Sequence, residues 1–181
     1  DTVYALALHL CADCSPGNIT TTVYKSTDGG ASWSPASSGL PSTGVALTVS
    51  VSKLVLDAKS PGTVYAATQT GLFRTRDGGA SWSVTGLLSR VKDVAIDPWD
   101  SNVLYSATDG GGVLRSLDGG LTWQPINSGL PDLSAQAIVI DSAGAFLHVT
   151  TLLGGVYDLQ LPRRIHAVES SRGIRAVKPR T

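Results

Sequence analysis

The chain has 181 residues, a length that suggests one domain, and its 42% hydrophobic content is enough for a folded core, which excludes a disordered chain. Charged residues make up only 15%, and no apolar stretch reaches the ~18 residues of a membrane-spanning helix. The net charge of zero divides unevenly, because residues 162–181 carry +5 and residues 1–161 carry −5. An acidic body lacks the positive field that phosphate binding needs, so nucleic acid is not an expected partner.

A short motif recurs three times along the chain, with the pattern [Ser/Thr]-x-Asp-Gly-Gly-x-[Ser/Thr]-Trp. Its aspartates follow one another at spacings of 49 and 41 residues, and the similarity extends to the segments before each copy, such as residues 64–75 and 104–116. Repetition at a period of about 40 residues indicates an architecture built from one repeated supersecondary unit. The aspartate and tryptophan of the three copies are Asp28 and Trp33, Asp77 and Trp82, and Asp118 and Trp123.

Each repeat contains short stretches of β-branched or aromatic residues bounded by Gly, Pro, Asp or Ser, which is typical of strands, and no stretch shows helical periodicity. We therefore predict an all-β protein made of β-propeller blades, each with four antiparallel strands named A to D from the axis outward. The first repeat begins at its B strand, residues 2–8, and the last has lost the motif, so we expect three and a half to four blades. The predicted repeats are residues 1–46, 47–88, 89–131 and 132–161, followed by a basic tail at 162–181.

The repeated motif suits a tight turn between the C and D strands. An aspartate can accept hydrogen bonds from backbone N–H groups just beyond it, and glycines allow positive φ at low cost. The tryptophan that opens the D strand can pack its ring against the turn and bury a large apolar area. Because a turn is needed in every blade and a catalytic acid only once, we expect structural roles for Asp28, Asp77 and Asp118.

These segments resemble Asp-box, or BNR, repeats, whose pattern is Ser-x-Asp-x-Gly-x-x-Trp. The longer repeat, represented by residues 64–82, is similar to the repeats of bacterial photosystem-assembly-type propellers and to blades of sortilin-type receptors, sialidases and xyloglucan-degrading hydrolases. The resemblance covers residues 2–160 and implies the propeller fold. It leaves the function open, because Asp-boxes occur in both enzymes and binding proteins.

The incomplete first blade leaves two arrangements open. Residues 164–168 could supply the D strand of the fourth repeat, and residues 173–177, which are similar to an A strand, could then pair beside residues 2–8 and close a four-bladed ring. Alternatively, the chain is a fragment of a larger propeller, or an open arc that self-associates through its exposed blade edges.

The two largest departures from the repeat fall where the B–C and D–A connections of the predicted blades emerge. One is the B–C connection of the first repeat, residues 9–20, and the other is the D–A connection at residues 34–53. Loops of this kind often carry binding on a rigid scaffold, although simple drift in loop length would leave the same pattern. The candidate binding residues on this side are His9, Asp13, Asn18, Arg90 and Asp109.

Cys11 and Cys14 form a Cys-x-x-Cys motif in the first of these connections. The alternatives are a disulfide that staples the loop in an oxidising compartment, a pair of free thiols, and a metal or redox site, for which the sequence offers no further ligands. Trp99 is the only tryptophan outside the repeated motif. It lies in the A–B connection of the third repeat, either as an exposed binding residue or packed against the neighbouring blade.

No catalytic constellation stands out. The resemblance to sialidases implies a tyrosine with a glutamate partner, and the only glutamate is Glu169 in the tail. Asp57, Asp97 and Asp141 recur once per repeat at the ends of A strands, which favours turn capping over catalysis. No phosphate-binding loop, dinucleotide fingerprint or metal motif occurs, so we expect no metal and no cofactor.

We therefore expect a non-catalytic scaffold that binds a protein or glycan partner through the B–C and D–A connections. The alternative is one portion of a larger Asp-box glycoside hydrolase whose catalytic residues lie outside this chain. The low charge and the many Ser and Thr residues favour an extracytoplasmic protein, secreted or periplasmic, and a disulfide between Cys11 and Cys14 would favour it too.

Overall fold

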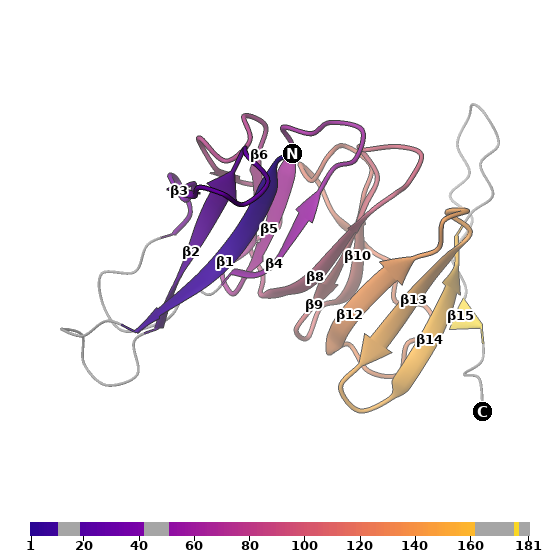
Figure 1. Cartoon of the computed structure of the whole chain (residues 1–181). Coiled ribbons are helices and arrows are strands. Elements are labelled where there is room, and N and C mark those ends of the chain that lie inside the picture. The colour runs from indigo at the N-terminus through magenta and orange to yellow at the C-terminus, as the bar shows by residue number, and fades with distance from the viewer. Residues whose placement is uncertain (11–18, 42–50, 162–175, 178–181) are drawn as a thin grey trace. The chain divides into compact units, whose positions relative to one another are not determined.

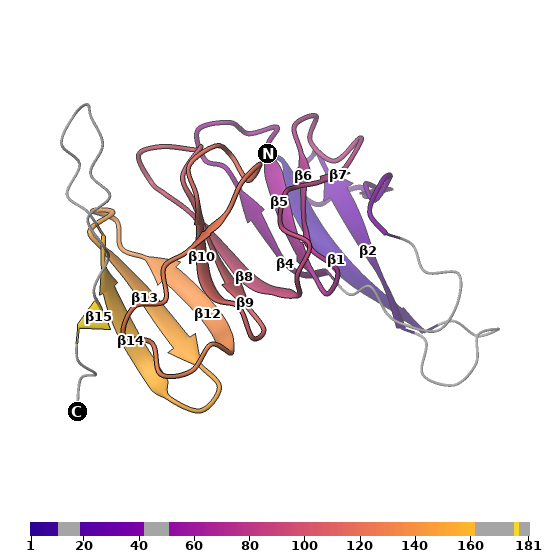
Figure 2. The same cartoon turned by 180° about the vertical axis from the view of Figure 1, so that it is seen from behind.

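The computed structural model describes residues 1–10, 19–41, 51–161 and 176–177, and for residues 8–10, 19–20 and 176–177 it describes the backbone alone. Every regular element in this part of the chain is a β-strand (Figures 1 and 2). The strands are β1 (Val3–Leu10), β2 (Ile19–Ser26), β3 (Ser34–Pro35), β4 (Val51–Leu56), β5 (Val64–Thr68), β6 (Leu72–Thr75), β7 (Ser83–Val84), β8 (Val91–Ile96), β9 (Leu104–Thr108), β10 (Gly112–Ser116), β11 (Gln124–Pro125), β12 (Ala135–Ile140), β13 (Phe146–Thr151), β14 (Gly155–Gln160) and β15 (Ala176–Val177).

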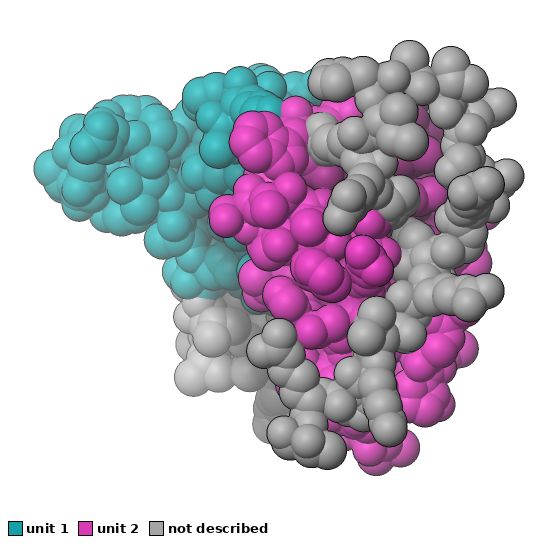
Figure 3. Space-filling model, turned by 90° about the vertical axis from the view of Figure 1, so that its right-hand side faces the viewer, with its two compact units in different colours: residues 1–88 teal, residues 89–181 magenta. Residues whose placement is uncertain are grey.

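The strands form four antiparallel sheets, in each of which neighbouring strands follow one another along the chain. The first sheet contains β1, β2 and β3, and the other three contain four strands each: β4–β7, β8–β11 and β12–β15. The predicted all-β fold with four-stranded antiparallel blades is therefore confirmed, and we call the sheets the first to the fourth blade. They are grouped in two compact units, residues 1–88 (unit 1) and 89–181 (unit 2), which Figure 3 colours separately.

The hydrophobic core of each unit lies between its two sheets. In unit 1, Val23 and Ala36 of the first blade join Val64, Phe73 and Trp82 of the second. In unit 2, side chains of β9 and β10 pack on those of β12, β13 and β14. The alternation of buried and less buried residues along β13 follows the period of two that places one face of a strand on a core. The second core includes Tyr105, Val113, Ile138, Leu147, Val149 and Leu159.

The first hairpin extends further than expected. β1 runs to Leu10 and β2 starts at Ile19, with all eight residues of each strand in register from Val3–Ser26 to Leu10–Ile19. Residues 9, 10, 19 and 20, which the sequence analysis placed in a connection, therefore belong to the ladder. The prediction ended the first strand too early because it was aligned with the shorter strands of the other repeats. The β-branched residues after Ile19 favour a strand, so the hairpin is longer in this blade.

The tail supplies the outer strand of the fourth blade, but not with the residues that the sequence suggests. Ala176 and Val177 form β15, which pairs with Leu159 and Asp158 of β14 in the position of a D strand. This pairing contradicts the arrangement in which residues 173–177 pair beside residues 2–8, and residues 164–168 lie outside the described residues. Because this repeat has no Asp-box hairpin to return a D strand, the outer edge of β14 is open to a strand from further along the chain.

Candidate functional site

The three box aspartates make the same hydrogen bonds. Asp28 Oδ1 accepts hydrogen bonds from the Ser26 hydroxyl at 2.7 Å and from the Ser32 N–H at 2.9 Å, and Oδ2 accepts one from the Ser32 hydroxyl at 2.6 Å. The corresponding atoms surround Asp77 and Asp118 at nearly the same distances. Both oxygens of each carboxylate are therefore occupied by the turn that carries it.

These bonds favour the charged carboxylate. The hydroxyl and N–H of Thr122 and the hydroxyl of Ser116 lower the pKa of Asp118 to about 2. The equivalent donors, led by the hydroxyl groups of Ser32 and Ser81, hold the pKa values of Asp28 and Asp77 well below their usual range. A carboxylate that is held as the anion by its own turn is poorly suited to act as a general acid.

We expect the Asp118→Asn variant to melt at a lower temperature at pH 7 and to lose part of the acid sensitivity of the wild type. A carboxyl group whose folded pKa lies below its unfolded value of about 3.9 stabilises the protein fully above that value, and the stabilisation is lost as the pH falls through about 2. Melting temperatures of both proteins between pH 5 and pH 2 test this. Parallel curves across that range would contradict the prediction, and Asp28→Asn should act in the same direction.

The aspartates that end the A strands also hold turns. Asp57 accepts a bond from the N–H of Lys59, Asp97 from that of Trp99, and Asp141 from that of Ala145, all to Oδ1. Their oxygens thus close the A–B connections, as the sequence analysis favours. Within the described residues no group of three or more His, Cys, Asp or Glu side chains is arranged to hold a metal ion, and no helix there could cross a membrane.

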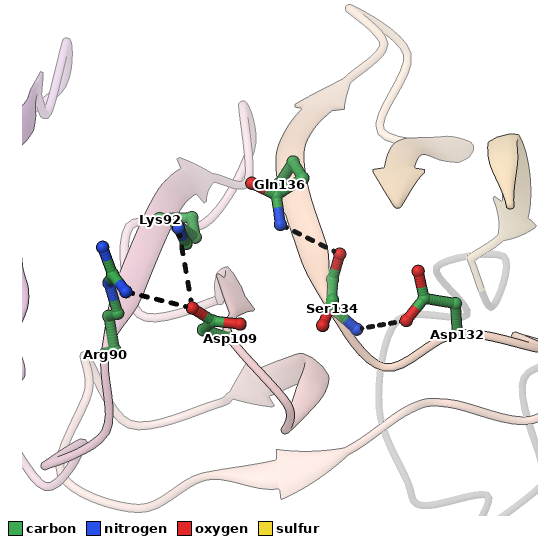
Figure 4. A network of polar contacts seen from close by, with 6 residues as sticks. All are labelled: Arg90, Lys92, Asp109, Asp132, Ser134 and Gln136. Carbon is green, nitrogen blue, oxygen red and sulfur yellow. Dashed lines mark hydrogen bonds and ion pairs between the residues drawn. The ribbon is translucent and has the colours of Figure 1, made fainter. Parts of the chain in front are cut away.

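A charged cluster lies in unit 2 where the D–A connection enters the third blade. Arg90 Nη1 donates to Asp109 Oδ2 at 3.3 Å, and Lys92 Nζ lies 3.6 Å from the same oxygen. Figure 4 shows both cations directed at this one carboxylate, which leaves a net positive charge on the cluster. Arg90 and Asp109, two of the predicted candidates, are therefore in direct contact.

Backbone pairing joins this cluster to the start of the fourth blade. Asp109 forms a bridge with Ser134, and the N–H of Gly112 donates to the carbonyl of Leu133 at 2.7 Å. Beyond Ser134, Asp132 accepts hydrogen bonds from the N–H groups of Ser134 at 2.9 Å and Leu153 at 2.8 Å, which lower its pKa. These bonds fix three connections, at residues 109–112, 132–134 and 152–154, as one surface that we call the loop face of unit 2, and Figure 4 shows its residues Asp109, Asp132 and Ser134.

Three leucines are exposed on the loop face. Leu133 is 41% exposed, Leu152 is 64% exposed and Leu153 is 87% exposed. Leu152 and Leu153 donate backbone hydrogen bonds to Ser134 and Asp132, so their positions are tied to that of Leu133. These exposed apolar side chains therefore share the loop face with Asp132 and lie on the side of unit 2 that carries Arg90, Lys92 and Asp109.

The opposite side of unit 2, which we call the box face, carries a second apolar group. Trp99 is 57% exposed and its Nε1 donates to the carbonyl of Ala143 in the A–B connection of the fourth blade, at 3.2 Å. The ring therefore both contacts the neighbouring blade and faces solvent. Leu117 and Leu121 of the third Asp-box are each 61% exposed.

The other predicted candidates are only partly described. His9 lies in β1 rather than in a connection, and the structure describes only its backbone. Asp13, Asn18, Cys11 and Cys14 also lie outside the described residues, so the predicted grouping of these residues with Arg90 and Asp109 stays a prediction.

Sequence reasoning missed the leucines and Lys92. A signal for the leucines was available, because the B–C connections of the second and third repeats contain Gln, Thr, Asp and Gly, whereas the fourth contains the pair Leu152 and Leu153. The sequence gives no signal for the contact of Lys92 with Asp109, because Lys92 lies inside a strand. Only the register of β8 places it next to Asp109.

Comparisons with known proteins agree with this architecture. A family model for the BNR/Asp-box repeat matches residues 24–35. An ancestral GH74 enzyme superposes with a TM-score of 0.59 and 20% identity over 76% of this chain and 21% of the enzyme. YCF48 from Cyanidioschyzon merolae gives a TM-score of 0.51 and 19% identity over 71% of this chain and 41% of YCF48.

A third solved structure is the extracellular domain of the one-component system BT4673 from B. thetaiotaomicron, with a TM-score of 0.58 and 16% identity over 79% of this chain and 20% of that one. This chain therefore spans less than half the length of each of these proteins. The search of curated protein sequences gives no match. Likenesses at this level of identity establish the fold, and the fold alone does not assign an activity.

Proposed function

Because the chain is built of Asp-box repeats on β-propeller blades, we propose that it is a non-catalytic scaffold that binds a protein partner through the loop face of unit 2. The observation that carries the proposal is the group of exposed leucines, Leu133, Leu152 and Leu153, beside Arg90 and Lys92. Hydrogen bonds between the connections fix the backbone that carries the leucines, so binding would not have to order these loops.

The chemistry of the loop face suggests the kind of partner. Three leucines offer an apolar contact area, which an aliphatic or aromatic side chain of a partner would cover. Arg90 and Lys92 share one carboxylate, so a partner carboxylate could approach the pair without facing a net negative charge. A protein segment that combines apolar and acidic residues fits both features better than an uncharged glycan does.

The comparisons are compatible with this proposal without deciding it. The similar structures include both YCF48 and a GH74 enzyme, and the likeness to each extends to the fold. The alternative, a portion of a glycoside hydrolase, needs two carboxyl groups to act on a glycosidic bond, and the sequence analysis places them outside this chain. The box aspartates do not supply them, because both oxygens of each accept hydrogen bonds from the turn.

We also propose an extracytoplasmic location. The low content of charged residues is compatible with it, and one similar structure is described as an extracellular domain.

A selection of random peptides on the intact chain, run in parallel with an oligosaccharide array, tests the function. We expect selected peptides to be rich in apolar and acidic residues and their binding to weaken about tenfold or more in the variant Leu152→Asp/Leu153→Asp. Arg90→Glu should weaken acidic peptides in particular.

The matched control is Leu117→Asp/Leu121→Asp on the box face, where the leucines are as exposed as Leu152. This variant should bind the selected peptides as the wild type does. Loss of binding in the control variant alone would move the site to the box face. Binding of an oligosaccharide, with no peptide selected, would favour a glycan partner or the hydrolase alternative, and turnover by this chain alone would overturn the scaffold proposal.

A further inference from the structure

The box face of the third blade departs from the repeat at three positions, and each departure places an exposed apolar side chain there. Trp99 is 57% exposed, and Leu117 and Leu121 are each 61% exposed. The corresponding turns of other blades keep the same hydrogen bonds with polar or small residues at these positions, so the turns do not require apolar ones. The corresponding residues are Lys59 for Trp99, Thr27 and Arg76 for Leu117, and Ala31 and Ala80 for Leu121.

Hydrogen bonds link the connections that carry these three side chains. The N–H of Gly119, which lies between the two leucines in the chain, donates to the carbonyl of Asn102 in the connection of Trp99, at 2.9 Å. Trp99 Nε1 donates to the carbonyl of Ala143 at 3.2 Å, and its ring lies so close to Gly144 that a Cβ added there would be 3.1 Å from Cδ1. The fold therefore holds the indole in one orientation and ties its connection to the Asp-box turn.

The same connections are acidic. Residues 97–103, 117–122 and 141–145 contain no lysine or arginine, and the cation nearest to them along the chain is Arg115 of β10. Hydrogen bonds within its own turn lower the pKa of Asp118 to about 2, so this carboxylate is charged throughout the physiological range. Apolar side chains on the box face of unit 2 therefore lie in a negative field. The aspartates of these connections are Asp97, Asp100, Asp118 and Asp141.

This combination discriminates between classes of ligand. A negative field opposes the phosphate groups of nucleic acids and the anionic headgroups of membranes. Leu117 and Leu121 offer no hydrogen bonds to the hydroxyl groups of a glycan. By contrast, the face of a tryptophan ring attracts an arginine or lysine side chain, and neighbouring carboxylates attract the same cation. A peptide segment that carries both cationic and aliphatic side chains matches the charge and the apolar residues together.

We propose that the box face of unit 2 docks a segment of a partner protein in which arginine or lysine alternates with aliphatic residues. A cation of the segment lies over the ring of Trp99, and its aliphatic side chains cover Leu117 and Leu121. This surface is on the opposite side of unit 2 from the loop face and takes a segment of opposite charge. The inference therefore goes beyond the proposed function.

A short synthetic peptide of alternating arginine and leucine is the probe, and the same peptide with glutamate in place of arginine is its control. We expect the arginine peptide to bind the full chain saturably, with one peptide per chain, in a titration followed by the NMR signals of the tryptophan indole N–H groups. The signal of Trp99, identified by its absence in Trp99→Phe, should shift, whereas that of the buried Trp82 should not. The glutamate peptide should bind at least about tenfold more weakly.

Two variants of the third Asp-box separate apolar contact from simple charge attraction. Leu117→Thr/Leu121→Ala gives this box the residues of the first box, so it should fold normally and bind the arginine peptide about tenfold more weakly. Leu117→Asp/Leu121→Asp should also weaken binding, although it adds negative charge. The matched control, Leu152→Asp/Leu153→Asp, adds the same charge on the loop face and should bind the probe as the wild type does.

Absence of saturable binding would overturn the proposal, as would equal binding of the glutamate peptide. Tighter binding by Leu117→Asp/Leu121→Asp would overturn it too, because charge alone would then explain the attraction. A neutral oligosaccharide that shifts the Trp99 signal when the peptide does not would replace the protein segment by a glycan. Self-association that Leu117→Thr/Leu121→Ala abolishes would show that a second copy occupies the face. The acidic peptides expected at the loop face should bind this variant normally, so either proposal can fail alone.

Discussion

Trp82→Ala should destabilise the protein by about 3–5 kcal/mol, whereas Trp33→Ala, at the same position of the same motif, should cost about 1 kcal/mol. Trp82 is 5% exposed, and its Nε1 donates to the carbonyl of Ala36 in the first blade at 2.7 Å. Trp33 is 43% exposed, and its Nε1 bonds to Gly30 within its own turn at 3.0 Å. Truncation of Trp82 therefore leaves a cavity between two sheets, and truncation of Trp33 does not.

Chemical unfolding gives the free-energy differences and thermal unfolding gives the midpoint temperatures, both followed by far-ultraviolet circular dichroism. We expect the midpoint temperature of Trp82→Ala to fall by about 10 °C or more and that of Trp33→Ala by only a few degrees. Equal effects would mean that the tryptophan acts through its own turn alone. In that case the contact with Ala36 would contribute nothing to the packing of the first two blades.

The Asp-box turns are a part of the structure that can be predicted from the sequence. The turn chemistry of the motif and its repetition predict structural roles for Asp28, Asp77 and Asp118, and the structure places the same donors around each carboxylate. Local motifs of this kind are predictable because every interaction lies within a few residues of the aspartate. The same holds for the four-strand pattern, which depends on short hydrophobic stretches and the turns between them.

The sequence contains a second repeated motif. Ser-Gly-Leu-Pro occurs at residues 38–41 and 128–131, in both cases just after a D strand. Gly39 and Gly129 have φ values of 89° and 85°, and the N–H of Leu40, like that of Leu130, donates to the residue three positions earlier. Two copies were too few to stand out beside the three boxes, although they form the same turn.

Features that depend on distant residues could not be predicted. The pairing of Ala176 and Val177 with β14 joins residues 17 and 19 positions apart, and a two-residue strand leaves almost no pattern. Leu133, Leu152 and Leu153 form a group only because backbone bonds join their connections. A surface that is assembled from three connections becomes visible when the register of the sheets is known.

Gly39→Ala should cost about 3 kcal/mol, whereas Gly29→Ala should cost about 1 kcal/mol. Both glycines have positive φ, 89° for Gly39 and 74° for Gly29, so alanine is strained at either position. Only at Gly39 would the added Cβ also meet a neighbour, the backbone carbonyl oxygen of Trp82, while at Gly29 nothing lies within 4 Å. The difference between the two variants therefore measures the close approach of the two blades rather than backbone strain.

The effects of Trp82→Ala and Gly39→Ala on stability should be coupled, because both residues belong to the contact between the first and the second blade. The N–H of Trp82 donates to the carbonyl of Ser38 at 2.8 Å, and its indole holds Ala36, so the segment with Gly39 is fixed from both sides. Once Trp82→Ala has removed the indole, the segment can move away from an alanine at position 39. A double-mutant cycle should then give a coupling of about 1 kcal/mol or more, with Gly39→Ala costing less in the Trp82→Ala background. Strict additivity would show that the two residues stabilise the blades independently.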